Sequence, residues 1–99
     1  MKFYQLLRYG FSLLQVLIEK YLSNLIARYK LEQGKIKEIL QNENKEQNEK
    51  TLEVMDEIGK KRGAVISGGE IDRDRVANIL LEDFRSGKLG KITLEETNK

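Results

Sequence analysis

Residues Arg62–Leu94 read RGAVISGGEIDRDRVANILLEDFRSGKLGKITL and carry the most complete helix signal in the chain. Asp72 can accept a hydrogen bond from an unpaired backbone N–H of a first helical turn, as a good N-cap residue does. Ile71 and Val76 have the spacing of a hydrophobic staple around that cap. Gly87 supplies the left-handed conformation in which many helices end. The stretch therefore predicts a helix that starts after Asp72 and is closed by Gly87.

This predicted helix has one apolar stripe and one polar face. The apolar residues recur at spacings of three and four, as on one buried helix face, and are Val76, Ala77, Ile79, Leu80, Leu81 and Phe84. Opposite them lie Arg75, Asn78, Glu82 and Arg85. We expect that polar face to contact solvent or a partner. Asp83 falls near the stripe, where a structural hydrogen-bonding role is favoured over contact with a ligand.

The composition limits both the fold class and the chemistry. A chain of 99 residues, with 39% hydrophobic and 34% charged residues, fits one small globular domain. It lacks proline and is rich in Leu, Ile, Glu and Lys, which favours an all-α fold. It also lacks Cys and His, which removes disulfides, thiolate chemistry, the usual general base and the commonest metal ligand. The sequence SGKLGKIT does not have Walker spacing, and we expect this chain to be neither an enzyme nor the binder of a cofactor.

The first third of the chain is its most apolar part. Residues 1–31 are predicted to form an apolar helical segment, because Leu, Ile, Phe and Tyr recur through it at helical spacing. One long helix and two helices with a break near Ser23 are both compatible with this pattern. The uncharged run Tyr9–Ile18 is far shorter than the roughly 20 residues that a membrane span needs, so no membrane partner is expected.

The rest of the chain is predicted to contain a polar region and then a helix pair. Residues 32–50 should contain a short helix followed by a flexible polar linker, because QNENKEQNEK, residues 41–50, has no apolar side chain to bury. The short helix would be anchored by Ile36, Ile39 and Leu40. Residues 51–95 are predicted to form a helix pair with a basic C-terminal tail. Residues 1–99 would thus make a single helical domain.

Cationic residues gather in two runs. The first run is Lys60, Lys61 and Arg62, and the second is Arg85, Lys88 and Lys91. The net charge of +2 does not by itself imply nucleic-acid binding, but no acidic residue occurs from Ser86 to Leu94. Long cations and backbone N–H groups there suit a phosphate backbone. The first run lies in a last helical turn, where the helix dipole favours cations anyway, so an ordinary helix-end role is equally compatible with it.

The segment Lys60–Glu95 closely resembles the C-terminal end of the ribosome biogenesis GTPase A family. The resemblance rests on the patterns KRG, GGE, D-x-x-R, DFRSGKLG and ITLE, which occur in that order. Upstream, RYKLE at Arg28–Glu32 is similar to a segment that ends an earlier helix of the same domain. The resemblance implies a small bundle of about four helices with an ANTAR-like C-terminal part. Its parent would be a circularly permuted GTPase that takes part in assembly of the large ribosomal subunit.

The function that the resemblance implies is that of a non-catalytic RNA-binding domain. It would dock a cytoplasmic GTPase on 23S rRNA of the large ribosomal subunit, with the protein's own GTPase domain as a second partner and no small-molecule substrate. GTP and Mg²⁺ would belong to the parent family, whose GTPase motifs this chain lacks. The residues of this chain that the resemblance implies to face RNA are Arg62, Arg75, Arg85, Lys88 and Lys91, with Lys60 and Lys61 as electrostatic support. The conformational glycines are Gly63, Gly68, Gly69, Gly87 and Gly90.

The broad apolar face of residues 1–31 supports an alternative hypothesis. A helical segment that is apolar beyond one ordinary face can form a contact surface for another protein. On this hypothesis the chain is a protein-interaction or oligomerisation module, which docks on a GTPase domain or on another copy of itself. The two hypotheses are compatible with each other.

Overall fold

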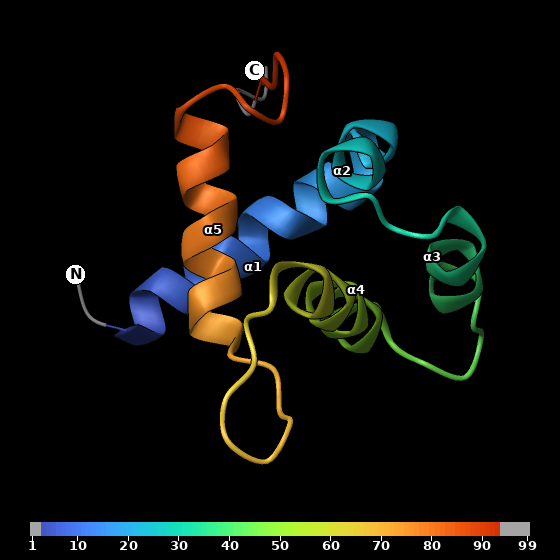
Figure 1. The fold of residues 1–99 in the computed structure, drawn as a ribbon. Coiled ribbons are helices and arrows are strands. Elements are labelled where there is room, and N and C mark those ends of the chain that lie inside the picture. Colours follow the sequence, from blue (N-terminus) through green and yellow to red (C-terminus); the bar gives the residue numbers. More distant parts are fainter. Residues whose placement is uncertain (1–2, 94–99) are drawn as a thin grey trace.

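A computed structural model describes residues 3–93, which form five helices (Figure 1). In chain order these are α1 Phe3–Lys20, α2 Leu22–Tyr29, α3 Gln33–Leu40, α4 Gln47–Arg62 and α5 Arg73–Arg85. The all-α prediction is confirmed, with one helix more than the four or so that were expected. Helix α5 lies across α1, and α3 lies at the periphery against α4. Residues 1–2 of the predicted apolar segment and residues 94–95 of the predicted tail lie outside the described residues.

The apolar opening segment consists of two helices, α1 and α2, which meet at Tyr21, two residues before Ser23. Tyr21 has φ −135° and ψ 38°, and its side chain does not cap the first turn of α2. Its hydroxyl instead accepts a hydrogen bond from the backbone N–H of Thr93, 3.2 Å away in the C-terminal tail. The bend allows both helices to enter one core, with Leu17 and Leu25 fully buried.

The polar region is only partly a linker. The short helix predicted around Ile36 and Ile39 is confirmed as α3, and both side chains are buried. The prediction of a linker through residue 50 is wrong in its second half, because α4 begins at Gln47. A capping box starts this helix: the N–H of Glu46 donates to the carboxylate of Glu49 at 3.0 Å, and the Glu46 side chain reaches the backbone of Glu49 in return. Such a box satisfies N–H groups of the first turn without any apolar side chain.

Helix α5 has the boundaries that its local signals predict. The Asp72 carboxylate accepts a hydrogen bond from the backbone N–H of Arg75 at 3.2 Å. At the other end Gly87 has φ 79°, its N–H donates to Phe84 O at 3.2 Å, and the N–H of Lys88 donates to Asp83 O at 2.9 Å. This pair of bonds is the usual way in which a glycine closes a helix. The predicted start and end of the helix are confirmed.

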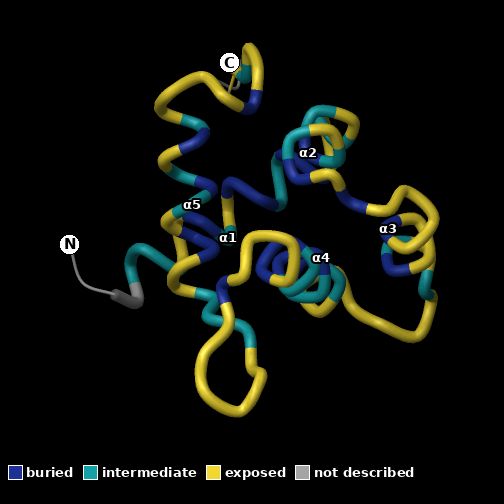
Figure 2. The backbone as a smooth tube through the Cα atoms, viewed as in Figure 1, coloured by how far each residue is buried: buried dark blue, intermediate teal, exposed yellow. Residues whose placement is uncertain are grey.

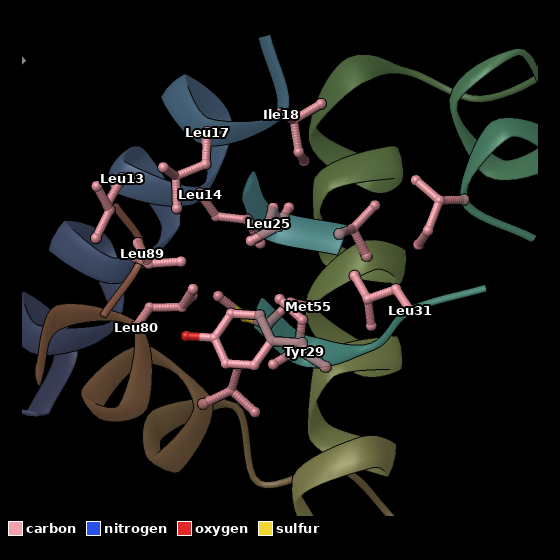
Figure 3. Packing of buried hydrophobic residues seen from close by; sticks show 14 of the residues in the cluster. Leu13, Leu14, Leu17, Ile18, Leu25, Tyr29, Leu31, Met55, Leu80 and Leu89 are labelled. Atoms are coloured by element: carbon pink, nitrogen blue, oxygen red, sulfur yellow. The ribbon is translucent and has the colours of Figure 1, made fainter. Parts of the chain in front are cut away.

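One hydrophobic core connects all five helices (Figure 3). Each helix contributes fully or almost fully buried side chains, for example Leu17 from α1, Leu25 from α2, Ile36 from α3, Met55 from α4 and Leu80 from α5. In Figure 2 the buried residues face the middle of the molecule, whereas residues 65–70, between α4 and α5, are exposed. Among the described residues, no helix combines the length and the apolar character that crossing a membrane requires.

Candidate nucleic-acid interface

The C-terminal tail turns back from α5 onto α2, which places part of the predicted basic tail beside that helix (Figure 1). Gly87 and Gly90 have φ values of 79° and 96°, a region that glycine occupies far more easily than other residues. Between them Leu89 is buried, and its carbonyl oxygen accepts a hydrogen bond from Asn24 Nδ2 at 2.9 Å. The tail is therefore held against α2, and Lys88 lies near the cations of that helix.

A hydrogen-bonded network joins α2 to α5 beneath this region. Arg28 binds the Asp83 carboxylate with two nitrogens, at 3.1 Å and 3.3 Å. The Tyr29 hydroxyl donates to Asp83 Oδ2 at 2.7 Å, and Figure 3 shows that hydroxyl on the side of the ring that faces α5. Burial alone would raise the pKa of Asp83, but the hydrogen bonds from Arg28 and Tyr29 outweigh it, so the pKa is lowered. Asp83 is thus an ionised structural residue, as its place near the apolar stripe predicted.

Cationic side chains surround this network and form the surface that we call the basic surface. Its members are Arg28, Lys30, Lys61, Arg62 and Lys88. The first four line a depression of about 400 Å³ together with Tyr29. Arg28 and Lys30 also line the neighbouring depression, whose other wall includes Lys88. Residues from α2, the end of α4 and the tail are therefore brought together by the fold.

The positive charge of the basic surface is only partly neutralised. The Asp83 carboxylate is engaged by Arg28 and Tyr29. Within residues 3–93, no carboxylate lies at ion-pair distance from Lys30, Lys61 or Lys88. These three ammonium groups are exposed and can reach an external anion.

The remaining predicted site residues lie outside the basic surface. Lys60 pairs with Glu57 of the preceding turn at 3.2 Å, and Arg85 pairs with Glu82 at 3.1 Å. Arg75 is exposed near the start of α5, and Lys91 is exposed in the tail. Neither of the two depressions is lined by any of these four residues. Exposed ion pairs are weak, so Lys60 and Arg85 could exchange their carboxylate partners for an RNA phosphate. Contact of these two residues with RNA stays a prediction, and so does contact of Arg75 and Lys91.

Sequence reasoning missed Arg28 and Lys30 as members of the site. Both belong to RYKLE, the segment Arg28–Glu32 that was recognised only as the end of an early helix. Lys30 ends α2 in a left-handed conformation, with φ 54°, and this turn directs the chain toward α3. The two cations of the sequence RYK were therefore a signal that the sequence contained. That they lie near Lys61 and Arg62 at the end of α4 depends on tertiary folding.

The charged groups that converge at this surface are mostly cationic. Within residues 3–93, no three acidic side chains gather in a way that could hold a metal ion. The groups that converge are guanidinium and ammonium groups with one engaged carboxylate. Such a set of groups suits the binding of a polyanion.

The chain is similar to part of several known proteins. The ribosome biogenesis GTPase A of Bacillus licheniformis is 35% identical over 83 residues, which are 84% of this chain and 25% of that protein. The protein of the same name from Bacillus cereus is 47% identical over 47 residues, which are 48% of this chain and 16% of that protein. The chain thus spans about a quarter, or less, of the length of these curated relatives. No family model and no solved structure matches it. The predicted resemblance to the ribosome biogenesis GTPase A family is confirmed.

Proposed function

We propose that this chain, which is related to a segment of ribosome biogenesis GTPase A, is a non-catalytic RNA-binding domain. It docks on 23S rRNA of the large ribosomal subunit during assembly in the cytoplasm. GTP and Mg²⁺ chemistry would belong to a GTPase domain elsewhere in the longer protein. The observation that carries the proposal is the basic surface, where Lys30, Lys61 and Lys88 line two depressions and have no ion-pair partner among the described residues.

The balance of charge at the basic surface favours a phosphate backbone as the ligand. Arg28 compensates Asp83 at 3.1 Å, and the charge of Arg62 also acts on this carboxylate. The charges of Lys30, Lys61 and Lys88 have no compensating carboxylate among the described residues. Long cations spread over two adjoining depressions can contact successive phosphates, and release of counterions then drives binding. Such contacts position a protein on RNA without reading its sequence.

We expect the double substitution Lys61→Ala, Lys88→Ala to weaken binding to 23S rRNA roughly tenfold or more at low salt. Because this variant makes two phosphate contacts fewer, its binding releases fewer counterions from the RNA. The slope of log affinity against log salt should therefore become shallower by about 1.4–1.8, from a starting value near −3.5 to −4.5 for about five contacts. Filter binding of the purified chain to 23S rRNA and to large subunits, between about 50 and 200 mM salt, measures both quantities.

The control for this experiment is the pair Lys35→Ala, Lys37→Ala. Both lysines are exposed on α3, so the net charge changes by the same amount at a place away from the basic surface. We expect affinity and salt slope to change far less in this variant. Equal losses from the two pairs would contradict a localised site, because they would mean that only the total charge matters.

An apolar depression between α1 and α5 favours the alternative of protein interaction. It has a volume of about 280 Å³ and is lined by Tyr9, Ser12, Leu13, Val16, Leu81 and Phe84. Tyr9 is 54% exposed. A large aromatic side chain at the edge of an apolar depression is a common feature of interaction surfaces.

Self-association through the apolar depression has a direct test. If a second copy occupies it, the mass measured by light scattering should rise with protein concentration. Tyr9→Ser should reduce that rise by removing an exposed ring, and it should leave RNA binding unchanged. A mass that stays that of a monomer over the whole range excludes this form of the alternative and leaves a GTPase domain as the candidate partner.

A further inference from the structure

The guanidinium group of Arg62 lies over the ring of Tyr29 in the depression of the basic surface. The guanidinium carbon of Arg62 lies 5.0 Å from the centroid of the Tyr29 ring. The ring is only 2% exposed, and its hydroxyl donates to Asp83 at 2.7 Å. Burial and the neighbouring carboxylate raise the pKa of Tyr29, so the hydroxyl remains a hydrogen-bond donor at neutral pH. The fixed ring holds the guanidinium above it in a defined place.

The guanidinium has a second face that the ring does not cover. Arg62 is an exposed residue, so this outer face can be reached by a ligand. Planar guanidinium groups stack on the bases of RNA. In a regular duplex the bases are stacked on one another, and only bases in loops, bulges and ends can be turned outward. An Arg62 platform therefore suits one unpaired base.

The surroundings of Arg62 suit the phosphates on either side of such a base. Lys30 and Lys61 line the same depression of about 400 Å³, and neither pairs with a carboxylate among the described residues. A volume in this range is typical of pockets that hold a small molecule or part of a larger one, which measure roughly 300–1,000 Å³. Stacking and phosphate contact can thus occur together at one place.

We propose that Arg62, supported by Tyr29, stacks on one unpaired RNA base, so that the basic surface binds looped or bulged RNA in preference to an uninterrupted duplex. This inference rests on the proposed RNA-binding function and specifies the class of RNA. Arg62 acts through the planarity of its side chain in addition to its charge. Lysine at position 62 keeps the positive charge but lacks the planar guanidinium group that stacks on a base.

The experiment compares two RNA hairpins, one fully paired and one with a single unpaired adenosine in its stem. The wild-type chain should bind the bulged hairpin at least about fivefold more tightly, the lower end of what one stacked base contributes. Arg62→Lys should bind both hairpins about equally and keep the wild-type salt slope. With 2-aminopurine as the unpaired base, the wild-type chain should raise its fluorescence as the base leaves the RNA stack, and Arg62→Lys should not.

The control is Arg8→Lys, which makes the same exchange of one cation for another at an exposed position of α1, outside the basic surface. It should keep the preference for the bulged hairpin, and circular dichroism should show that both variants are folded. Equal binding of the two hairpins by the wild-type chain, or a preserved preference in Arg62→Lys, overturns the inference. If binding to 23S rRNA still depends on Lys61 and Lys88, only this inference fails. If no RNA is bound at all, the proposed function fails as well.

Discussion

Replacing Gly10 with valine is expected to lower the free energy of unfolding by roughly 3 kcal/mol or more, because α1 and α5 cross there without room for a side chain. A Cβ atom at Gly10 would lie 2.4 Å from Ala77 Cβ and 2.7 Å from Ala77 Cα. The second of these atoms is backbone, so it cannot move unless α5 moves. Urea unfolding followed by circular dichroism measures the change.

Alanine at position 10 has two opposing effects on stability, a higher helix propensity and a closer contact with Ala77. Its helix propensity exceeds that of glycine by about 1 kcal/mol, whereas overpacking in a core typically costs about 1–3 kcal/mol. We expect Gly10→Ala to be destabilising, by less than valine. In the control Gly34→Ala, on α3, no atom lies within 4 Å of the added Cβ, so the substitution should be neutral or stabilising.

A compensating substitution makes this test specific to the helix crossing. Ala77→Gly removes the atom that lies closest to the new Cβ, so the double variant Gly10→Ala, Ala77→Gly should recover part of the lost stability. Ala77→Gly alone should be destabilising, because it loses a buried methyl group and helix propensity. If Gly10→Ala unfolds at the wild-type urea concentration, the close approach of the two helices is wrong.

The fold was predictable from the sequence where its determinants are local. The Asp72 cap and the Gly87 end lie within the segment that they delimit, and the structure confirms both. The break at Tyr21 has no capping side chain, and Tyr21 contacts Thr93, which is distant in the sequence. The close approach at Gly10 likewise depends on α5. Contacts of this kind arise only from tertiary packing, and the local pattern carries no signal for them.

The candidate site likewise has a part that was visible in the local sequence and a part that depends on tertiary packing. Lys61, Arg62 and Lys88 stood out because cations cluster in the sequence there. Lys88 joins Arg28 and Lys30 only because the tail folds back onto α2, and no spacing within the sequence predicts that. The pairing of Arg85 with Glu82 is different, since it has the i, i+3 spacing of neighbours on one helix face. That pairing was visible in the sequence, and the convergence of the basic surface was not.

Replacing Asp83 with alanine is expected to lower the free energy of unfolding at pH 7 by about 2–3 kcal/mol, because three donor groups, two nitrogens of Arg28 and the Tyr29 hydroxyl, lose their acceptor. The Tyr29 side chain is buried, and its hydroxyl loses its 2.7 Å hydrogen bond to the Asp83 carboxylate in this variant. The Arg28 side chain is 28% exposed, so water can solvate it in part, and we expect less than the loss for a fully buried ion pair. The control Glu82→Ala breaks the exposed pair with Arg85 and should cost less than about 1 kcal/mol.

The Asp83 network also gives the protein a defined sensitivity to acid. The pKa of Asp83 is lower in the folded chain than in the unfolded chain, where it is about 3.9. The stabilisation is therefore complete above that unfolded value and fades as the pH falls toward the folded one. Asp83→Asn cannot ionise, so the difference in unfolding free energy between wild type and this variant should be largest near pH 7 and should shrink below pH about 4.

Urea unfolding of both proteins over a series of pH values measures this difference. A difference that stays constant down to pH about 3 would mean that the pKa of Asp83 is the same in the folded and the unfolded chain, so that the fold does not favour the ionised carboxylate. That result would matter beyond stability. The Asp83 carboxylate fixes the Tyr29 ring on which Arg62 lies, so a weakened network should also weaken the preference for an unpaired base. Measuring RNA preference in Asp83→Asn therefore connects the buried network to the surface that it supports.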